Sequence, residues 1–126
     1  MKRWLALLAV VVFSGCNSPT SPDLPLGLDL GSLTERQRFI YNYTQCLGEW
    51  TGIGEIRVTF EYDLGDSAAG KAVTAHRWVR YHIESVENGP DSYLKALAAH
   101  EVSHLTGANE VQAVELENVW PQICGC

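Results

Sequence analysis

The chain has 126 residues, of which 15 are acidic and 9 basic, and its formal net charge is −6. This length suits one compact domain and leaves little room for a second. The acidic balance argues against binding of nucleic acid, or of anionic lipid, through a basic surface.

The first 15 residues have the pattern of an export signal. Two basic residues, Lys2 and Arg3, precede an unbroken apolar run from Trp4 to Phe13. This run is too short to cross a bilayer as a permanent helix. We therefore expect residues 1–15 to be a signal peptide that is removed during export.

The tetrapeptide Phe13-Ser14-Gly15-Cys16 resembles a bacterial lipobox, although Leu is more usual at its first position. The resemblance implies that Cys16 is lipidated, becomes the mature N-terminus and anchors the protein to a membrane of the cell envelope. Asn17 stands where an Asp would resemble an inner-membrane retention signal. In a bacterium with two membranes we therefore expect the outer one. The alternative is an ordinary cleaved signal with a chance cysteine.

A tether is expected over residues 16–32. This segment contains three of the five prolines, with Ser, Gly and Asp between them, and no apolar period runs through it. It therefore predicts a spacer between the lipidated Cys16 and the folded part of the chain. The three prolines are Pro19, Pro22 and Pro25.

Three cysteines follow Cys16, namely Cys46, Cys124 and Cys126. The oxidising compartment of an exported protein favours one disulfide, which leaves an odd thiol. A bridge within Cys124-Gly125-Cys126 would close a strained ring. We therefore expect Cys46 to pair with Cys124, as our candidate pair, or with Cys126. The sequence leaves both alternatives open.

Residues 33–126 are expected to form one α+β domain. A first helix is predicted from apolar residues that share one helical face and is expected to end near Gly52. Strict alternation from Ile56 to Asp63 predicts a half-buried strand, and weaker alternation from Ala72 to Glu84 a second, with a loop between them. The apolar face of the first helix contains Phe39, Tyr43, Cys46, Leu47 and Trp50.

Capping residues mark where the helices begin. A capping box fits the start of the first helix in two registers, Ser32–Glu35 and Thr34–Gln37. The tripeptide Asn88-Gly89-Pro90 interrupts the chain, and Asp91 or Ser92 is expected to cap the next helix.

This next helix, over about residues 91–106, carries an HExxH motif made by His100, Glu101 and His104. The two histidines lie about 40° apart around the helix axis, so they can share one tetrahedral Zn²⁺. Glu101 lies between the imidazoles and the apolar face of the helix, within reach of a water on the metal. That apolar face contains Leu94, Ala98, Val102 and Leu105.

The longer pattern His100-Glu101-x-x-His104-x-x-Gly107-x-x-Glu110 resembles the metzincin signature HExxHxxGxxH, which belongs to zincin-type zinc metallopeptidases. In that family the Gly ends the helix and turns the chain, and the third ligand follows three residues later. The resemblance implies that His100, His104 and Glu110 bind Zn²⁺ and that Glu101 is the catalytic base. It also implies a minimal zincin-like fold: a small twisted sheet packed on an N-terminal helix and the motif helix, followed by a short C-terminal helix.

Two features depart from the metzincin pattern. Residue 110 is Glu rather than His or Asp, and the chain has no methionine after Met1, so the Met-turn of that family is missing. The segment Asn109-Glu110-Val111-Gln112-Ala113 resembles instead the NExxA-type segment of gluzincins, whose third ligand is a Glu on a later helix. Both resemblances lead to Glu110. Weaker substitutes for it are Glu115 and Glu117.

The implied reaction is hydrolysis of a peptide bond in a peptide or protein substrate, bound extended along an edge strand. A donor for the developing oxyanion is not evident; Arg80, His82 and Tyr93 are the candidates. Two alternatives remain. The first is a non-catalytic protein, either a lipoprotein that binds zinc or a degenerate zincin that has become a binding protein. The second is a structural envelope lipoprotein in which the motif arises by chance.

Overall fold

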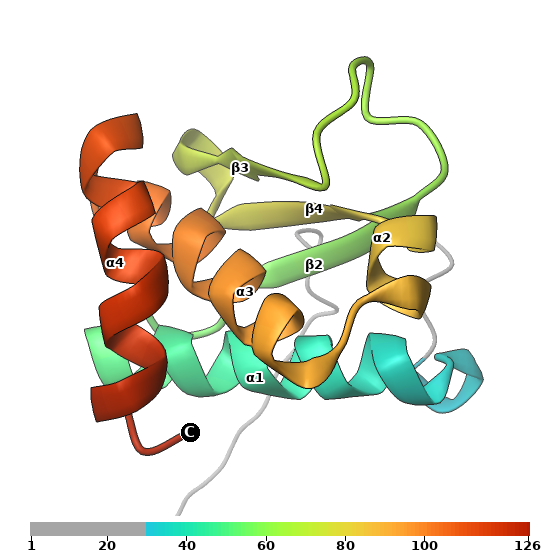
Figure 1. Cartoon of the computed structure of the whole chain (residues 1–126), viewed down its shortest axis with the longest axis horizontal. Coiled ribbons are helices and arrows are strands. Elements are labelled where there is room, and N and C mark those ends of the chain that lie inside the picture. Colours follow the sequence, from blue (N-terminus) through green and yellow to red (C-terminus); the bar gives the residue numbers. More distant parts are fainter. Residues whose placement is uncertain (1–29) are drawn as a thin grey trace, which may run out of the picture.

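The computed structural model describes residues 30–126. The expected signal peptide, the lipidation site Cys16 and most of the expected tether lie outside the described residues. The described part is an α+β domain, as expected, in which helices surround one face of a small mixed sheet (Figure 1). It opens with a short 3-10 helix, η1 (Leu30–Ser32).

Helix α1 (Glu35–Thr51) is the first long element. Of the two capping registers, the structure uses the second: the Thr34 side chain accepts from the Gln37 backbone N–H, and the Gln37 side chain accepts from the Thr34 N–H. The helix ends at Gly52, as expected. Its inner face buries Ile40, Tyr43, Thr44, Leu47 and Gly48.

The sheet has three strands in the order β2-β4-β3. Strand β2 (Arg57–Glu61) runs parallel to β4 (Trp78–His82), and β3 (Gly70–Val73) pairs antiparallel with β4. Among the described strands, β3 is therefore an edge strand with β4 on one side only.

The single strand expected over residues 72–84 is wrong. The 3-10 helix η2 (Thr74–His76) and the left-handed Arg77, at φ 48°, turn the chain back and split the segment into the β3–β4 hairpin. Strand β3 also begins at Gly70, inside the expected loop. At the other end Ile83 starts helix α2 (Ile83–Asn88) instead of continuing the strand.

Helix α3 (Asp91–Leu105) carries the HExxH motif. The expectation that Asp91 or Ser92 caps it is wrong, because Pro90 occupies the N-cap position and no side chain makes a cap hydrogen bond there. Asp91 is the first helical residue, and its carboxylate is paired with Arg36 of α1 at 2.7 Å. The negative charge of Asp91 in the first turn still suits the helix dipole.

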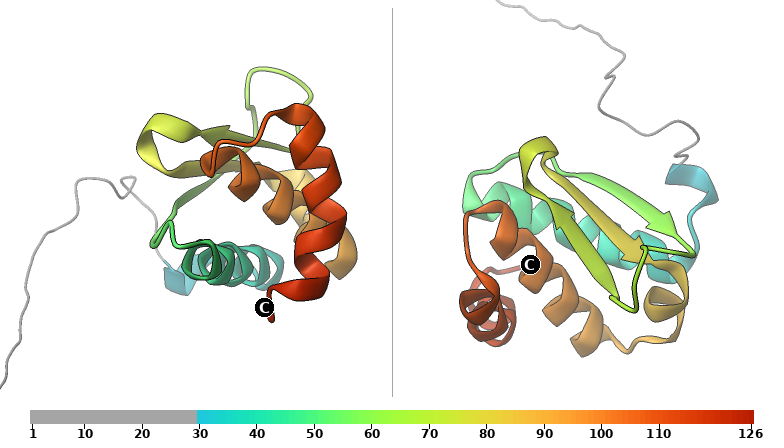
Figure 2. Two further views of the ribbon diagram at one scale, coloured as in Figure 1. Left: turned by 90° about the vertical axis from the view of Figure 1, so that its left-hand side faces the viewer. Right: turned by 90° about the horizontal axis from the view of Figure 1, so that it is seen from above.

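The core lies between the sheet and two helices, because α1 and α3 lie against the same face of the sheet (Figure 2). The expected apolar face of α3 points into it: Leu94, Ala98 and Val102 are fully buried, and Leu105 is partly buried. From the sheet the core receives Val58, Val79 and Tyr81.

Helix α4 (Glu110–Ile123) packs on α3 at the side of the domain (Figure 1). Residues 110, 113, 117 and 120 are spaced three and four apart, so they form a stripe along one side of α4. Ala113 on this stripe is fully buried, and Trp120 meets Trp50 of α1 edge to face, with ring centroids 5.4 Å apart. The opposite side of α4 exposes Val111, Val114, Val119 and Ile123.

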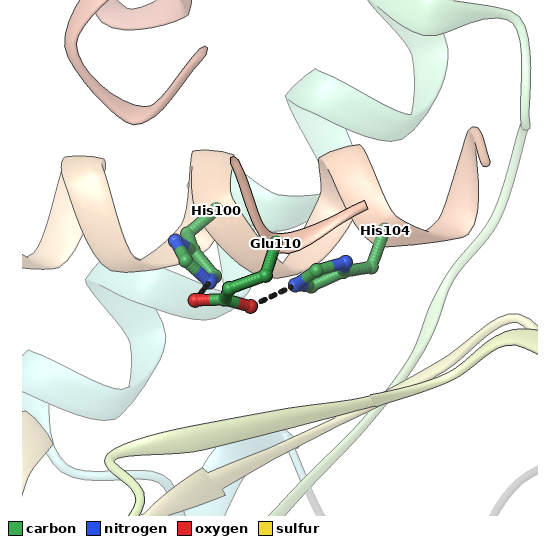
Figure 3. Close-up of side chains that lie close together, drawn as sticks. All are labelled: His100, His104 and Glu110. Atoms are coloured by element: carbon green, nitrogen blue, oxygen red, sulfur yellow. Dashed lines mark hydrogen bonds and ion pairs between the residues drawn. The ribbon is translucent and has the colours of Figure 1, made fainter. Parts of the chain in front are cut away.

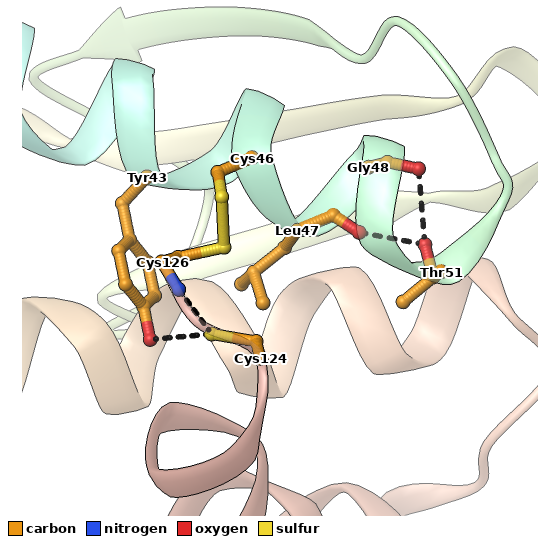
Figure 4. Close-up of a disulfide and its surroundings, with 7 residues drawn as sticks. All are labelled: Tyr43, Cys46, Leu47, Gly48, Thr51, Cys124 and Cys126. Atoms are coloured by element: carbon orange, nitrogen blue, oxygen red, sulfur yellow. Dashed lines mark hydrogen bonds between the residues drawn. A yellow bond between two sulfur atoms is a disulfide. The ribbon is translucent and has the colours of Figure 1, made fainter.

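A disulfide ties the C-terminal end of α4 to α1, and it joins Cys46 to Cys126 (Figure 4). The candidate pair Cys46–Cys124 is therefore wrong, whereas the alternative with Cys126 is present. The reason is the direction of each side chain: Cys124 is buried and lies 3.5 Å from the Tyr43 hydroxyl, and the left-handed Gly125 then turns Cys126 toward Cys46. No helix within residues 30–126 is long and apolar enough to cross a membrane.

Candidate metal centre

His100 and His104 lie one turn apart on α3, on a different face from the core residues. Their ring centroids are 5.0 Å apart, and their side chains are 15% and 23% exposed. The helix thus presents two imidazoles side by side at the surface of the domain, where a ligand from solvent can reach them.

The chain reverses direction directly after His104. Gly107 has φ +103°, a left-handed conformation that non-glycine residues seldom adopt, and its N–H donates to the His104 carbonyl. Asn109 then caps α4 through a capping box with Gln112. Because the turn is this short, Glu110, the first residue of α4, lies back across the end of α3.

The carboxylate of Glu110 consequently lies between the two imidazoles (Figure 3). Its Oε2 is 3.2 Å from Nε2 of His100, and its Oε1 is 3.1 Å from Nε2 of His104. One ligand atom from each of the three residues lies within 4.8 Å of the others. Two imidazole nitrogens and one carboxylate oxygen at this spacing fit a divalent metal ion, with a position left open to solvent.

Hydrogen bonds on the far side of each ring favour this fit. Nδ1 of His104 is 2.9 Å from the Ala108 carbonyl oxygen, which can only accept, so Nδ1 carries the proton. Nδ1 of His100 is 2.7 Å from Oε1 of Glu117. When both rings are neutral and protonated on Nδ1, their Nε2 lone pairs face Glu110, which is the arrangement that metal ligation requires. Glu115, the other weaker substitute for Glu110, is exposed on α4.

Glu101 is buried beside the two histidines, with 6% of its surface exposed. Gly70 of β3 lies directly over it: a Cβ added to Gly70 would be 3.1 Å from the Glu101 Cγ. Burial raises the pKa of the Glu101 carboxyl, and the charges of His100 and His104 oppose this shift. The group is therefore a stronger base than an ordinary solvated carboxylate.

His100 is subject to opposing influences. Burial alone would lower the pKa of His100, but the hydrogen bond from its ring to Glu117 and the nearby negative charges of Glu101 and Glu110 together raise it. Without a metal ion the acidic side chains around this ring thus favour its protonated form. A proton and a metal ion therefore compete for this imidazole.

A cleft of about 810 Å³ opens between β3 and α3, and the three clustered residues and Glu101 all line it. Of the three oxyanion candidates, only Tyr93 lines the cleft. Arg80 is held in an ion pair with Glu61, and His82 lies 2.9 Å from the Ser85 hydroxyl. The remaining walls come from Asp66, Ala68, Ala69, Gly70, Lys71, Ala72, Thr74, Ala96, Leu97, Gly107, Ala108 and Glu117.

Sequence reasoning missed two features of the site. It weighed Glu117 only as a substitute for Glu110, although the spacing of seven between them already puts both on one helical face. It gave Gly70 no role, because the approach of β3 to Glu101 depends on the fold.

No protein-family model matches the chain, and comparison with curated proteins and with solved structures finds no match.

Proposed function

We propose that this protein is a zinc-dependent peptidase in which His100, His104 and Glu110 hold the metal ion. The observation that carries the proposal is the carboxylate of Glu110 between two Nε2 atoms, at 3.1 and 3.2 Å. Glu101 lies beside this cluster in the same cleft. A purely structural metal site has no use for a base in that position.

Zinc is the metal that suits these donors best. Imidazole nitrogens favour zinc over magnesium and calcium, which prefer oxygen ligands. Two histidines and one glutamate are also a known ligand set of catalytic zinc, in which the fourth position stays open. The cluster faces a cleft rather than the core, so a fourth ligand has room to enter.

A zinc ion bound here would polarise the scissile carbonyl and lower the pKa of a water molecule. Glu101 would act as the base that takes a proton from the attacking water and as the acid that returns it to the leaving nitrogen. Its burial suits this task, because burial raises the pKa of the Glu101 carboxyl and so makes its carboxylate a better proton acceptor. Gly70 holds one wall of the site against Glu101 and limits where its carboxylate can move.

An extended peptide is the substrate that the cleft suits. Residues 70–72 of the edge strand β3 line it, and an edge strand offers backbone hydrogen bonds to an added strand. Tyr93 precedes His100 by seven residues, about 10 Å along the helix. It is therefore placed to contact a substrate side chain away from the reacting carbonyl.

We place this chain with the zincin-type metallopeptidases, in a metzincin-like variant that has Glu at the third ligand position. The pattern from His100 to Glu110, with the reversal at Gly107, supports this assignment over a gluzincin-like one. We further propose that Cys16 anchors the enzyme in the cell envelope, where it acts on peptides or proteins outside the cytoplasm.

The test is a comparison of wild type with Glu101→Gln. Zinc content is measured by elemental analysis, and hydrolysis by cleavage of a quenched fluorescent peptide library. We expect both proteins to bind zinc and the variant to lose at least about a hundredfold in rate. Zinc lost together with activity would make Glu101 a ligand, and full activity in the variant would rule out this mechanism.

One observation favours a second candidate function, a non-catalytic zinc-binding protein. The chain has no methionine after Met1, so the Met-turn that lies beneath the metal in metzincins is missing. In the same experiment this function predicts one bound zinc and no hydrolysis by wild type over the whole peptide library.

A further inference from the structure

Helix α4 contacts His100 at both ring nitrogens. Glu110 approaches Nε2 at 3.2 Å, and Glu117 approaches Nδ1 at 2.7 Å. The two glutamates lie seven residues apart, on the same face of α4, with the buried Ala113 between them. The small side chain of Ala113 allows α4 to approach α3 closely enough for both contacts.

The contact with Glu117 is partly shielded from water. The side chain of His100 is 15% exposed and that of Glu117 is 31% exposed, against 71% for Glu110. Ionised carboxylates only accept hydrogen bonds, and one faces each nitrogen of the His100 ring. The contact of Nδ1 with Glu117, at 2.7 Å, is shorter and better shielded than that of Nε2 with Glu110, at 3.2 Å, so Nδ1 is the favoured position for the proton of the neutral imidazole. The lone pair is then on Nε2, the atom that faces the cluster.

We propose that Glu117 is a positioning residue for the metal site: it fixes the tautomer and the ring orientation of His100 without binding the metal. This inference rests on the proposed metal site. His104 has its own acceptor in the Ala108 carbonyl, a backbone group that no side-chain substitution removes. Glu117 is thus the acceptor that mutation can test.

A direct ligand role for Glu117 is the competing interpretation. Against it, the cluster whose ligand atoms lie within 4.8 Å of one another contains His100, His104 and Glu110. Oε1 of Glu117 contacts the opposite edge of the His100 ring instead. Acceptors of this kind change metal affinity by about 10- to 100-fold when they are removed.

The experiment measures zinc affinity by competition with a chromophoric chelator for wild type, Glu117→Ala, Glu117→Gln and the matched control Glu115→Ala. Glu115 is exposed on the same helix, away from the cluster. We expect Glu117→Ala to bind zinc about 10- to 100-fold more weakly, Glu117→Gln to recover most of the loss because its amide oxygen still accepts, and Glu115→Ala to match wild type.

Two further measurements separate positioning from ligation and from misfolding. The absorption spectrum of the cobalt-substituted protein reports the ligand set, and it should be unchanged in Glu117→Ala. The ¹⁵N shifts of His100 in metal-free protein at alkaline pH should report the Nδ1–H tautomer in wild type and a mixture in Glu117→Ala.

The possible outcomes are distinct. A changed cobalt spectrum would make Glu117 a ligand, and unchanged zinc affinity in Glu117→Ala would remove its positioning role; either result overturns the inference and leaves the proposed function standing. Wild type that binds no zinc would overturn the proposed function, and this inference with it. If Glu115→Ala loses as much zinc affinity as Glu117→Ala, the positioning role of Glu117 is also overturned, since the effect would then be general to α4.

Discussion

Gly70 of the edge strand lies in contact with Glu101 of the motif helix. A Cβ at position 70 would be 3.3 Å from Oε2 of Glu101 and 3.3 Å from Cδ1 of Leu97. These distances are tight enough that the neighbouring side chains would have to move. The absence of a side chain at position 70 thus helps to set where the proposed base lies.

The first prediction therefore concerns Gly70→Ala. We expect the added methyl group to displace the Glu101 carboxylate and to lower kcat by at least about tenfold, because small errors in the position of a catalytic group are costly. Zinc content should stay at the wild-type level, since the three atoms nearest to the added methyl group belong to Glu101 and Leu97 and not to a proposed ligand. Peptide hydrolysis and elemental analysis on the same preparations check this. Equal kcat in variant and wild type would show that the contact has no catalytic role.

The second prediction concerns the disulfide. Cys46 and Cys126 are 80 residues apart in sequence, and a closed loop of this length stabilises the folded state by about 4 kcal/mol. Cys46→Ser should lower the free energy of unfolding by about that amount, as measured by urea denaturation. A second measurement uses the wild-type protein, with its disulfide intact. Alkylation in denaturant, followed by tandem mass spectrometry of the C-terminal peptide, should place the label on Cys124. A label on Cys126 would contradict the observed pairing.

The third prediction concerns the ion pair on the outer sheet surface. Two hydrogen bonds from Arg80 lower the pKa of the Glu61 carboxyl below 4.5, against the opposing effect of burial. A carboxyl whose folded-state pKa is depressed stabilises the fold above its unfolded-state pKa. This stability is lost as the pH falls through the folded-state value.

Glu61→Gln should accordingly lower the free energy of unfolding by about 1 kcal/mol at neutral pH, since both side chains keep some solvent exposure. The difference from wild type should shrink as the pH falls below about 4.5 and vanish in strong acid. Urea denaturation over a pH series measures it, with Glu115→Gln as an exposed control. A difference that stays constant into strong acid would refute the role of the ion pair.

The fourth prediction concerns Cys16, which lies outside the described residues. Cys16→Ser should abolish metabolic labelling with a fatty acid and move the protein from the membrane fraction to the soluble fraction, because acyl chains rather than basic residues are the proposed anchor. Membrane fractionation and labelling that match wild type would show that Cys16 is not lipidated.

Local sequence patterns predicted much of the fold. The extent of α1, the strand β2, the motif helix α3 and its buried face at Leu94, Ala98 and Val102 all follow from apolar periodicity. The resemblance to the metzincin signature also predicted the approach of Glu110 to the histidines, and the local chain geometry agrees with it. Gly107 turns the chain, and only two residues separate it from Glu110.

Contacts between distant segments could not be predicted in the same way. The choice of Cys126 over Cys124 depends on how Gly125 turns the last residues, and the contact of Gly70 with Glu101 depends on where β3 lies relative to α3. The β3–β4 hairpin was missed because the left-handed residue in its turn is Arg77, which carries no turn signal in the sequence.

The proposed zinc site depends on Glu110 as its third protein ligand, beside the two histidines. The most direct test is the number of zinc ions bound per chain after dialysis, measured for wild type, Glu110→Ala and Glu115→Ala. We expect one zinc for wild type and for Glu115→Ala, and little or none for Glu110→Ala, because two histidines alone leave the metal without its third protein ligand. A Glu110→Ala variant that retains zinc as tightly as wild type would show that Glu110 is not a ligand.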